Sequence, residues 1–200
     1  MSKRIKFINK KSCYIDKTAK IGKNVVIYPN NYIGKGVEIG DNVTLLSGNF
    51  IEGVKIEKCC TIGPFSRIRP NTILSENVKI GNFVEVKNST IGKNTKISHL
   101  SYVGDCEIGD NCNIGCGVIF VNYNGKIKQK TKLGNNVFVG SNSNLIAPIE
   151  IGDYAYVCAG TNVTQNLDKL DFCIGRVKQL VKPNGAIKYL KCEQMFEKDS

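Results

Sequence analysis

The sequence predicts an all-β protein, a parallel β-helix built from hexapeptide repeats. Three features predict it: aliphatic residues recur every six positions, glycine follows many of them, and asparagine is frequent in the segments between them. A period of six fits neither the 3.6-residue period of an α-helix nor the two-residue alternation of an ordinary strand. It is typical of a β-helix in which each hexapeptide supplies one short strand and one bend.

The aliphatic row gives the expected strands in order. Its members are Ile15, Ile21, Ile27, Ile33, Ile39, Leu45, Ile51, Ile56, Ile62, Ile68, Leu74, Ile80, Val86, Ile91, Ile97, Val103, Ile108, Ile114, Phe120, Leu133, Val139, Leu145, Ile151, Val157 and Val163. The row comes one residue early at Ile56, Ile91 and Ile108, and it is interrupted between Phe120 and Leu133. Since three hexapeptides make one triangular coil of about 18 residues, the row predicts roughly eight stacked coils.

The residues between the strands are expected to form the corners of the coil. Glycine follows many aliphatic residues, and pairs ending in asparagine recur at 23–24, 41–42, 81–82, 93–94, 110–111 and 134–135. Both residue types tolerate the left-handed backbone that a tight bend requires. We therefore expect glycine and asparagine to supply the left-handed positions.

The repeat divides the chain into three expected parts. Residues 1–11 are a lead-in, and residues 12–166 are the β-helix, with a protruding loop at about 121–131 where the period is interrupted. The repeat fades in residues 167–200, which we expect to be a C-terminal extension. Within the extension, residues 183–185 (Pro-Asn-Gly) predict a turn.

The charge is strongly positive. The chain has 28 Lys and Arg against 17 Asp and Glu, a formal net charge of +11. Lysine is spread along the whole sequence, and aromatic residues are not interleaved with it as a stacking surface for nucleic acid would need, so no nucleic-acid partner is expected. A solvated lysine surface and a pocket for anionic small molecules both fit this composition.

Cysteine usage and hydropathy point to a cytoplasmic protein. No run of about 18 apolar residues is present, so no membrane partner is expected, and the N-terminus lacks the apolar stretch of a secretory signal. The nine cysteines are odd in number and contain no Cys-x-x-Cys pair. We expect reduced cysteines that fill space in the core, and no metal site.

His99 is the single histidine of the chain, and it lies shortly before the interruption of the repeat. Imidazole has an ordinary pKa near 6.5, so it suits a general base that removes a proton near neutral pH. A lone histidine is also compatible with a packed or surface role. The sequence around it decides between these interpretations.

Several non-repeat motifs resemble one family. They are Thr-Ile-Gly-Pro-Phe-Ser-Arg-Ile-Arg-Pro (61–70), Ile-Gly-Asn-Phe-Val-Glu-Val-Lys-Asn-Ser (80–89), His-Leu-Ser-Tyr-Val-Gly-Asp (99–105), Asn-Cys-Asn-Ile-Gly-Cys-Gly (111–117), Asn-Tyr-Asn-Gly (122–125) and Gly-Ser-Asn-Ser (140–143). Over roughly residues 12–190 the chain is similar to the C-terminal acetyltransferase domain of the bifunctional N-acetylglucosamine-1-phosphate uridylyltransferase / glucosamine-1-phosphate N-acetyltransferase family.

The resemblance implies a fold and a reaction. The β-helix would be left-handed, with active sites between the subunits of a homotrimer and the loop reaching toward a neighbour. The reaction would be direct acetyl transfer from acetyl-CoA to the 2-amino group of glucosamine 1-phosphate. Its product would be N-acetylglucosamine 1-phosphate, for UDP-N-acetylglucosamine synthesis. Because no segment has the pattern of a nucleotide-binding α/β domain, we expect a stand-alone acetyltransferase that needs no metal.

The resemblance also implies roles for individual residues. His99 would be the catalytic base, and Glu85 could orient it. The substrate would be bound by Arg69, Lys87, Tyr102, Asn113 and Asn122. Acetyl-CoA would be bound by Cys116, Tyr123, Lys128, Ser141, Ala159 and Arg176, with help from the C-terminal extension.

Two other functions fit the same pattern. One is acetyl-CoA-dependent N-acetylation of another, nucleotide-linked amino sugar, and the other is a non-catalytic trimeric scaffold. A β-helix carbonic anhydrase needs three zinc-binding histidines, and a chain with one histidine does not supply them.

Overall fold

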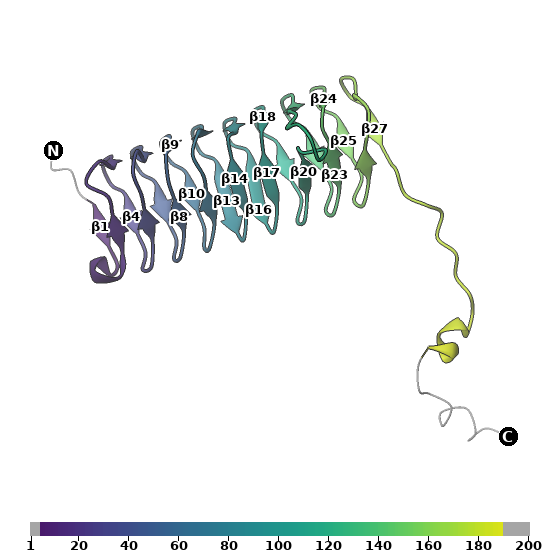
Figure 1. Cartoon of the computed structure of the whole chain (residues 1–200), viewed down its shortest axis with the longest axis horizontal. Coiled ribbons are helices and arrows are strands. Elements are labelled where there is room, and N and C mark those ends of the chain that lie inside the picture. Colours follow the sequence, from purple (N-terminus) through teal and green to yellow (C-terminus); the bar gives the residue numbers. More distant parts are fainter. Residues whose placement is uncertain (1–4, 190–200) are drawn as a thin grey trace, which may run out of the picture.

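The computed structural model describes residues 5–189, in which short parallel strands wind into one long prism with three sheets as its sides (Figure 1). Sheet A contains β1 (Lys6–Phe7), β4 (Val26–Ile27), β7 (Thr44–Leu45), β10 (Thr61–Ile62), β13 (Lys79–Asn82), β16 (Lys96–His99), β19 (Asn113–Ile114), β22 (Phe138–Val139), β25 (Tyr156–Val157) and β27 (Phe172–Cys173). Sheet B contains β2 (Tyr14–Ile15), β5 (Tyr32–Ile33), β8 (Phe50–Ile51), β11 (Arg67–Ile68), β14 (Glu85–Lys87), β17 (Tyr102–Gly104), β20 (Ile119–Val121), β23 (Asn144–Ile146) and β26 (Asn162–Val163). Sheet C contains β3 (Lys20–Ile21), β6 (Glu38–Ile39), β9 (Val54–Ile56), β12 (Thr72–Leu74), β15 (Thr90–Ile91), β18 (Cys106–Ile108), β21 (Thr131–Leu133) and β24 (Ile149–Ile151).

The predicted all-β solenoid of hexapeptide repeats is confirmed, but it is longer than the aliphatic row suggested. The described residues form sheets of ten, nine and eight strands, which is about nine turns rather than eight. Strands extend beyond 12–166 at both ends, to Lys6 and to Cys173. The row misses β27 because its inward residue is Cys173, which takes the place of an aliphatic side chain above Val157.

The aliphatic row forms the core along the axis of the prism. Ile27, Ile62 and Ile97 are fully buried, and most other members of the row are nearly so. Each such side chain contributes about 1.5–3 kcal/mol of hydrophobic stabilisation. Because each coil adds only a few of them, the stability of the prism depends on stacking many coils.

Asparagine and the glycines that follow the aliphatic residues have different roles at the corners. Asn24, Asn42 and Asn94 have left-handed φ values of 55°, 59° and 58°, as expected. The glycines that follow the aliphatic residues mostly do not have positive φ. They are needed for close approach, since a Cβ on Gly40 would lie only 2.7 Å from the backbone nitrogen of Lys58 in the next coil.

The asparagine pairs at 81–82 and 134–135 do not place their asparagine at the left-handed position. That position belongs to the following residue, Phe83 with φ 55° and Asn136 with φ 58°. Asn82 and Asn135 therefore do not form the left-handed bend. Asn82 instead contacts His99, as described below.

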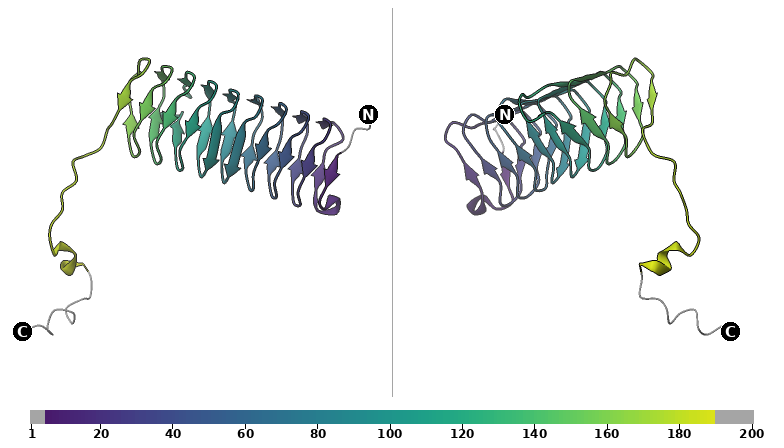
Figure 2. Two further views of the ribbon diagram at one scale, coloured as in Figure 1. Left: turned by 180° about the vertical axis from the view of Figure 1, so that it is seen from behind. Right: turned by 45° about the vertical axis from the view of Figure 1, so that its right-hand side comes forward.

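Two segments depart from the prism. A loop follows β20 and returns at β21, close to the predicted limits, and Figure 1 shows it in dark green across the neighbouring coils. Residues 174–189 leave the last coil as an extended segment (Figure 2). The segment contains the predicted Pro-Asn-Gly turn at 183–185, followed by the short 3-10 helix η2 (Gly185–Lys188); a second one, η1 (Lys10–Ser12), lies near the N-terminus.

The remainder of the predicted C-terminal extension, residues 190–200, lies outside the described residues. Across the described part of the chain, no helix is long and apolar enough to cross a membrane.

The close approach of the coils leads to a first prediction. In Gly92→Ala, the new methyl group would overlap the backbone of Gly109 in the next coil. We expect the free energy of unfolding to fall by about 1–3 kcal/mol, as for other overpacked sites. Urea unfolding followed by circular dichroism measures this. Lys93→Ala, at the exposed next position, is the control and should stay within about 0.5 kcal/mol of the wild type; equal midpoints for the two variants would contradict the packing argument.

Candidate functional site

His99 lies in a row of residues along the corner between sheets A and B. We call this the AB row; its members are Asn82, His99, Cys116, Ser141 and Ala159. Each coil is tied to the next there, since the amide following each residue donates to the carbonyl of the residue before it in the row: Leu100 to Asn82 at 3.0 Å, Gly117 to His99 at 3.4 Å, Asn142 to Cys116 at 2.8 Å and Gly160 to Ser141 at 2.8 Å. The row therefore places His99 in line with three of the residues expected to bind acetyl-CoA.

Asn82 holds the imidazole of His99. The two residues are register partners in β13 and β16, and Asn82 Oδ1 lies 2.7 Å from His99 Nδ1. With Nδ1–H donating to the amide oxygen, Nε2 carries the free lone pair. The ring is exposed, so Nε2 can reach a substrate.

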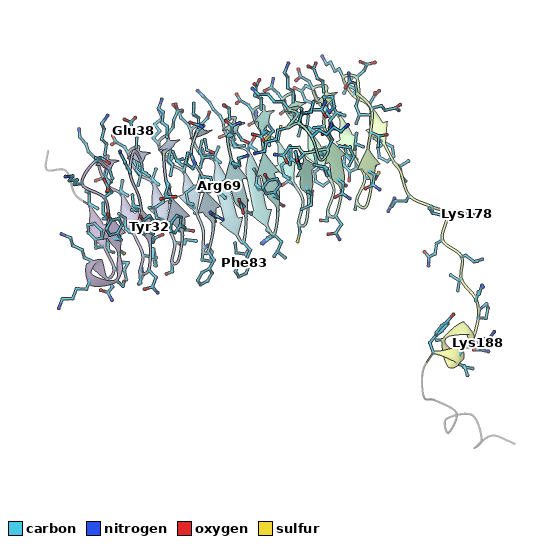
Figure 3. The ribbon with its side chains drawn as sticks, in the orientation of Figure 1. Tyr32, Glu38, Arg69, Phe83, Lys178 and Lys188 are labelled. Atoms are coloured by element: carbon cyan, nitrogen blue, oxygen red, sulfur yellow. The ribbon has the colours of Figure 1, made fainter. Side chains whose placement is uncertain are left out.

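Glu85 does not orient His99 as the sequence suggested. Its Oε1 accepts from Arg69 Nη1 at 2.9 Å. The side chains come from neighbouring strands of sheet B, where Glu85 pairs with Arg67. Glu85 therefore draws the guanidinium of Arg69 along the outer face of sheet B, where Figure 3 shows Arg69 on the broad side of the prism and Phe83, the neighbour of Asn82, at its edge.

A second group of residues surrounds Asp105 at the other edge of sheet B. We call it the Asp105 cluster; its members are Lys87, Asn88, Asp105 and Asn122. Asp105 is 5% exposed. Its carboxylate accepts from Asn88 Nδ2 at 2.6 Å and from Asn122 Nδ2, and Lys87 Nζ lies 3.5 Å away. Three successive coils thus contribute to one buried carboxylate.

Several interactions fix the charge of Asp105. Burial acts to raise the pKa of its carboxyl, but the hydrogen bonds from Asn88 and Asn122 and the positive charge of Lys87 outweigh burial, and the net effect lowers the pKa. Asp105 is therefore ionised, and it keeps Lys87 and Asn122 in fixed positions.

Tyr102 joins this cluster because Gly104 leaves room for it. Asn122 Nδ2 donates to Tyr102 Oη at 3.3 Å. A Cβ on Gly104 would lie 2.5 Å from that oxygen and 2.9 Å from Asn122 Nδ2. Glycine at this position lets the phenol and the amide converge.

Not all of the expected site residues come together in one chain. Asn113 is on the outer face of sheet A, and Tyr123 is exposed on the loop. Arg176, in the C-terminal segment, lies beside Gly160: its Cδ would be 3.7 Å from a Cβ added to that glycine. Since Gly160 follows Ala159, Arg176 lies near the end of the AB row. Lys128 lies at the end of the loop, where it pairs with Tyr123 in an antiparallel bridge.

Comparisons with known proteins agree with the fold and with the sequence motifs. The family model "Bacterial transferase hexapeptide (six repeats)" matches residues 18–53 and 130–165, and the "GMPPB C-terminal domain" model matches residues 50–120. The chain is 46% identical to the bifunctional protein GlmU of Caldicellulosiruptor saccharolyticus, over 98% of this chain and 45% of that protein. It is 41% identical to GlmU of Clostridium kluyveri, over 94% of this chain and 45% of that protein. The resemblance seen in the sequence is confirmed.

The chain spans a little under half the length of these curated relatives, and it corresponds to their C-terminal acetyltransferase part. Among solved structures, it is similar to LpxA, a UDP-N-acetylglucosamine acyltransferase from Bacteroides fragilis, with a TM-score of 0.69 and 21% identity over 80% of this chain and 68% of that one. It is also similar to perosamine N-acetyltransferase from Caulobacter crescentus, solved with CoA and GDP-perosamine, with a TM-score of 0.52 and 25% identity over 58% of this chain and 53% of that one.

Sequence reasoning missed Asn82 and the role of Asp105. Asn82 lies 17 positions before His99, and that coil is 17 residues long. The pairing of the two residues could therefore have been predicted if the length of the coil had been known. Asp105 closes the motif at 99–105, but only the stacking of coils reveals the lysine and the two asparagines around it.

The Asp105 cluster leads to a second prediction. In Asp105→Asn the left-handed backbone, with φ 52°, is tolerated, but the charge that holds Lys87 is lost. We expect the variant to be about 1–3 kcal/mol less stable than the wild type at pH 7, as for a lost charged hydrogen bond.

The difference should depend on pH in one direction. Since the folded pKa is lowered, the stabilisation is complete above the ordinary carboxyl pKa of about 3.9 and is lost as the pH falls through the lower folded value. Urea unfolding from pH 7 to pH 3 should show the two proteins converging below about pH 4. Glu107→Gln, at an exposed ion pair, is the control; a gap that widens in acid would contradict the charge assignment.

Proposed function

We propose that this chain transfers an acetyl group from acetyl-CoA to the 2-amino group of glucosamine 1-phosphate. The observation that carries the proposal is His99, held through Nδ1 by Asn82, at the edge of a sheet face that bears Arg69 and Lys87. Similarity to bifunctional GlmU over nearly the whole chain supports the same reaction.

The substrate phosphate binds Arg69 and Lys87, since guanidinium and ammonium groups suit phosphate oxygens. Tyr102 and Asn122 lie beside Lys87 and contact the sugar. The sugar then lies over sheet B with its amine toward His99.

Acetyl-CoA binds along the AB row. Cys116, Ser141 and Ala159 have small side chains that leave space for pantetheine next to His99, and Arg176 lies near the end of the row, where it can meet a CoA phosphate. The neutral amine attacks the thioester carbonyl, the C–N bond forms and the C–S bond breaks. His99 Nε2 accepts the amine proton and can return it to the CoA thiolate.

The active form is proposed to be a homotrimer with sites between subunits. Asn113 lies on sheet A and Lys87 on sheet B, so one chain does not bring both to the same sugar. A neighbouring chain would supply the missing side, and Tyr123 would reach acetyl-CoA across the boundary. Sedimentation velocity measures the assembly; a monomer with full activity would refute it.

A second candidate acceptor is a nucleotide-linked amino sugar. The similar perosamine N-acetyltransferase was solved with GDP-perosamine and CoA. Mass spectrometry of products from a panel of amino sugars separates the two candidates. Acetylation of a nucleotide amino sugar without acetylation of glucosamine 1-phosphate would exclude our first choice.

Removing the base gives the third prediction. His99→Ala should lower kcat at least about 10²-fold, the usual scale for losing a general base. A thiol-release assay with acetyl-CoA and glucosamine 1-phosphate measures the rate. Lys96→Ala, at an exposed position of the same strand, is the control. A loss of less than about threefold in His99→Ala would rule out His99 as the base, whereas no turnover by the wild type would favour the non-catalytic scaffold.

Asn82 gives the fourth prediction, as a residue that positions His99. Asn82→Ala should lower kcat about tenfold, with KM for both substrates nearly unchanged, because the tautomer is no longer fixed by one hydrogen bond. Asn82→Asp keeps the acceptor and adds a negative charge, which raises the pKa of a nearby imidazole. Its activity should recover, and the acidic limb of its pH–rate profile should move to higher pH. If the pH–rate profile of Asn82→Asp is the same as that of the wild type, Asn82 does not position His99.

A further inference from the structure

The corner between sheets A and B carries a second line of residues beside the AB row. We call it the left-handed column, because every member has a positive φ; its members are Asn30, Gly48, Phe65, Phe83, Leu100, Gly117, Asn142 and Gly160. From Phe83 onward, each member directly follows a member of the AB row in the sequence. The two lines therefore run side by side along the same corner of the prism.

The size of the side chains in the left-handed column changes abruptly from one coil to the next. Phe65, Phe83 and Leu100 are bulky, and their side chains are 54%, 58% and 55% exposed. The coil after Leu100 has Gly117 at this position, and the amide of Asn142 lies so close to it that a Cβ would not fit. Leu100 is therefore the last bulky residue before a low stretch of the corner.

The AB row changes in size at the same coil. It has the imidazole of His99 there, and in the following coils it has the smaller side chains of Cys116, Ser141 and Ala159. The stretch of the corner along which we place acetyl-CoA therefore ends against two larger side chains, those of His99 and Leu100.

The position of Arg176 gives the direction of acetyl-CoA along this corner. Arg176 lies beside Gly160, which follows β25, whereas Leu100 follows β16, and these strands are three coils apart in sheet A. At about 4.8 Å per coil the span is about 14 Å, which an extended pantetheine arm can bridge. With the CoA phosphates at Arg176 and the thioester carbonyl at His99, the acyl chain lies beyond the thioester, at the coil of Leu100.

We propose that Leu100 limits the length of the acyl group that this chain transfers, so that acetyl is accepted and longer linear acyl groups are rejected. The inference rests on the proposed function, since it concerns the acyl donor of that reaction. A longer acyl chain in this direction would overlap the isobutyl group of Leu100. The left-handed backbone supports a functional reason for leucine here, because the glycine or asparagine that other coils have at this position would avoid its cost.

The test measures kcat/KM with acetyl-CoA and with butyryl-CoA for the wild type and two variants. Since one additional methylene in a closed pocket changes kcat/KM about 10- to 200-fold, the wild type should prefer acetyl-CoA at least about tenfold. Leu100→Gly removes the side chain, so it should raise the ratio of butyryl-CoA to acetyl-CoA turnover at least about tenfold. Leu100→Phe should lower the same ratio, and Phe83 shows that phenylalanine is accepted in this backbone conformation.

Leu170→Gly is the matched control. Leu170 also has a left-handed φ, 69°, and is 69% exposed, but it lies at the corner between sheets C and A. Its replacement should leave the ratio within about twofold of the wild-type value, as for a distant site. Equal shifts in Leu100→Gly and Leu170→Gly, or a wild type that uses butyryl-CoA as well as acetyl-CoA, would overturn the proposal.

A binding measurement separates this proposal from the reaction itself. In calorimetric titrations of the protein with each thioester and no acceptor, no acyl group is transferred to a sugar. Weaker binding of butyryl-CoA than of acetyl-CoA to the wild type, with a smaller difference in Leu100→Gly, supports the limit even if glucosamine 1-phosphate is never acetylated. Equal binding of the two thioesters by the wild type refutes the limit, even if acetylation is observed.

Discussion

The vertical register between successive coils is the constraint on which the rest of the structure depends. In a parallel solenoid, each residue lies directly over a residue one coil earlier, and the side chains that meet are fixed by coil length. Tyr32 pairs with Phe50 over 18 positions, whereas Asn82 pairs with His99 over 17. One additional residue in that coil would place another side chain beneath the imidazole. The contact that fixes the tautomer of His99 is therefore a consequence of the shortened coil.

The fold was largely predictable from the sequence because one interaction, burial of an aliphatic residue at every sixth position, repeats throughout the chain. The ends were less predictable, since Cys173 and the residues around Lys6 continue the stacking without an aliphatic residue in the row. The glycines that follow the aliphatic residues were assigned the wrong physical task, because periodicity does not distinguish a bend from a close approach. Only the distance between Gly40 and the next coil shows that glycine is needed there for space.

For the site, residue type and motif identified His99, Arg69 and Lys87, but not what holds them. Asn82 and Asp105 were not found because their partners are far away in sequence and depend on register. Glu85 was paired with His99 when its nearest cation is Arg69. The sequence also does not reveal that the loop closes into a hairpin in which Lys128 pairs with Tyr123, because the path of an irregular loop is set by its own hydrogen bonds and not by the repeat.

The corner beside His99 has an unusual conformation that fits a covered site. Phe65, Phe83 and Leu100 have left-handed φ values of 58°, 55° and 48°, at positions where other coils have asparagine or glycine. Bulky residues in this region cost of order 1–2 kcal/mol each. Their side chains are also more than half exposed, and the two phenylalanine rings stack 5.7 Å apart. The fold of a single chain explains neither the left-handed backbone of these bulky residues nor the exposure of their apolar side chains. In the proposed trimer, a neighbouring subunit or the pantetheine of acetyl-CoA would cover these side chains. Water would then be excluded around the imidazole, which strengthens the interactions of His99 with the reacting groups.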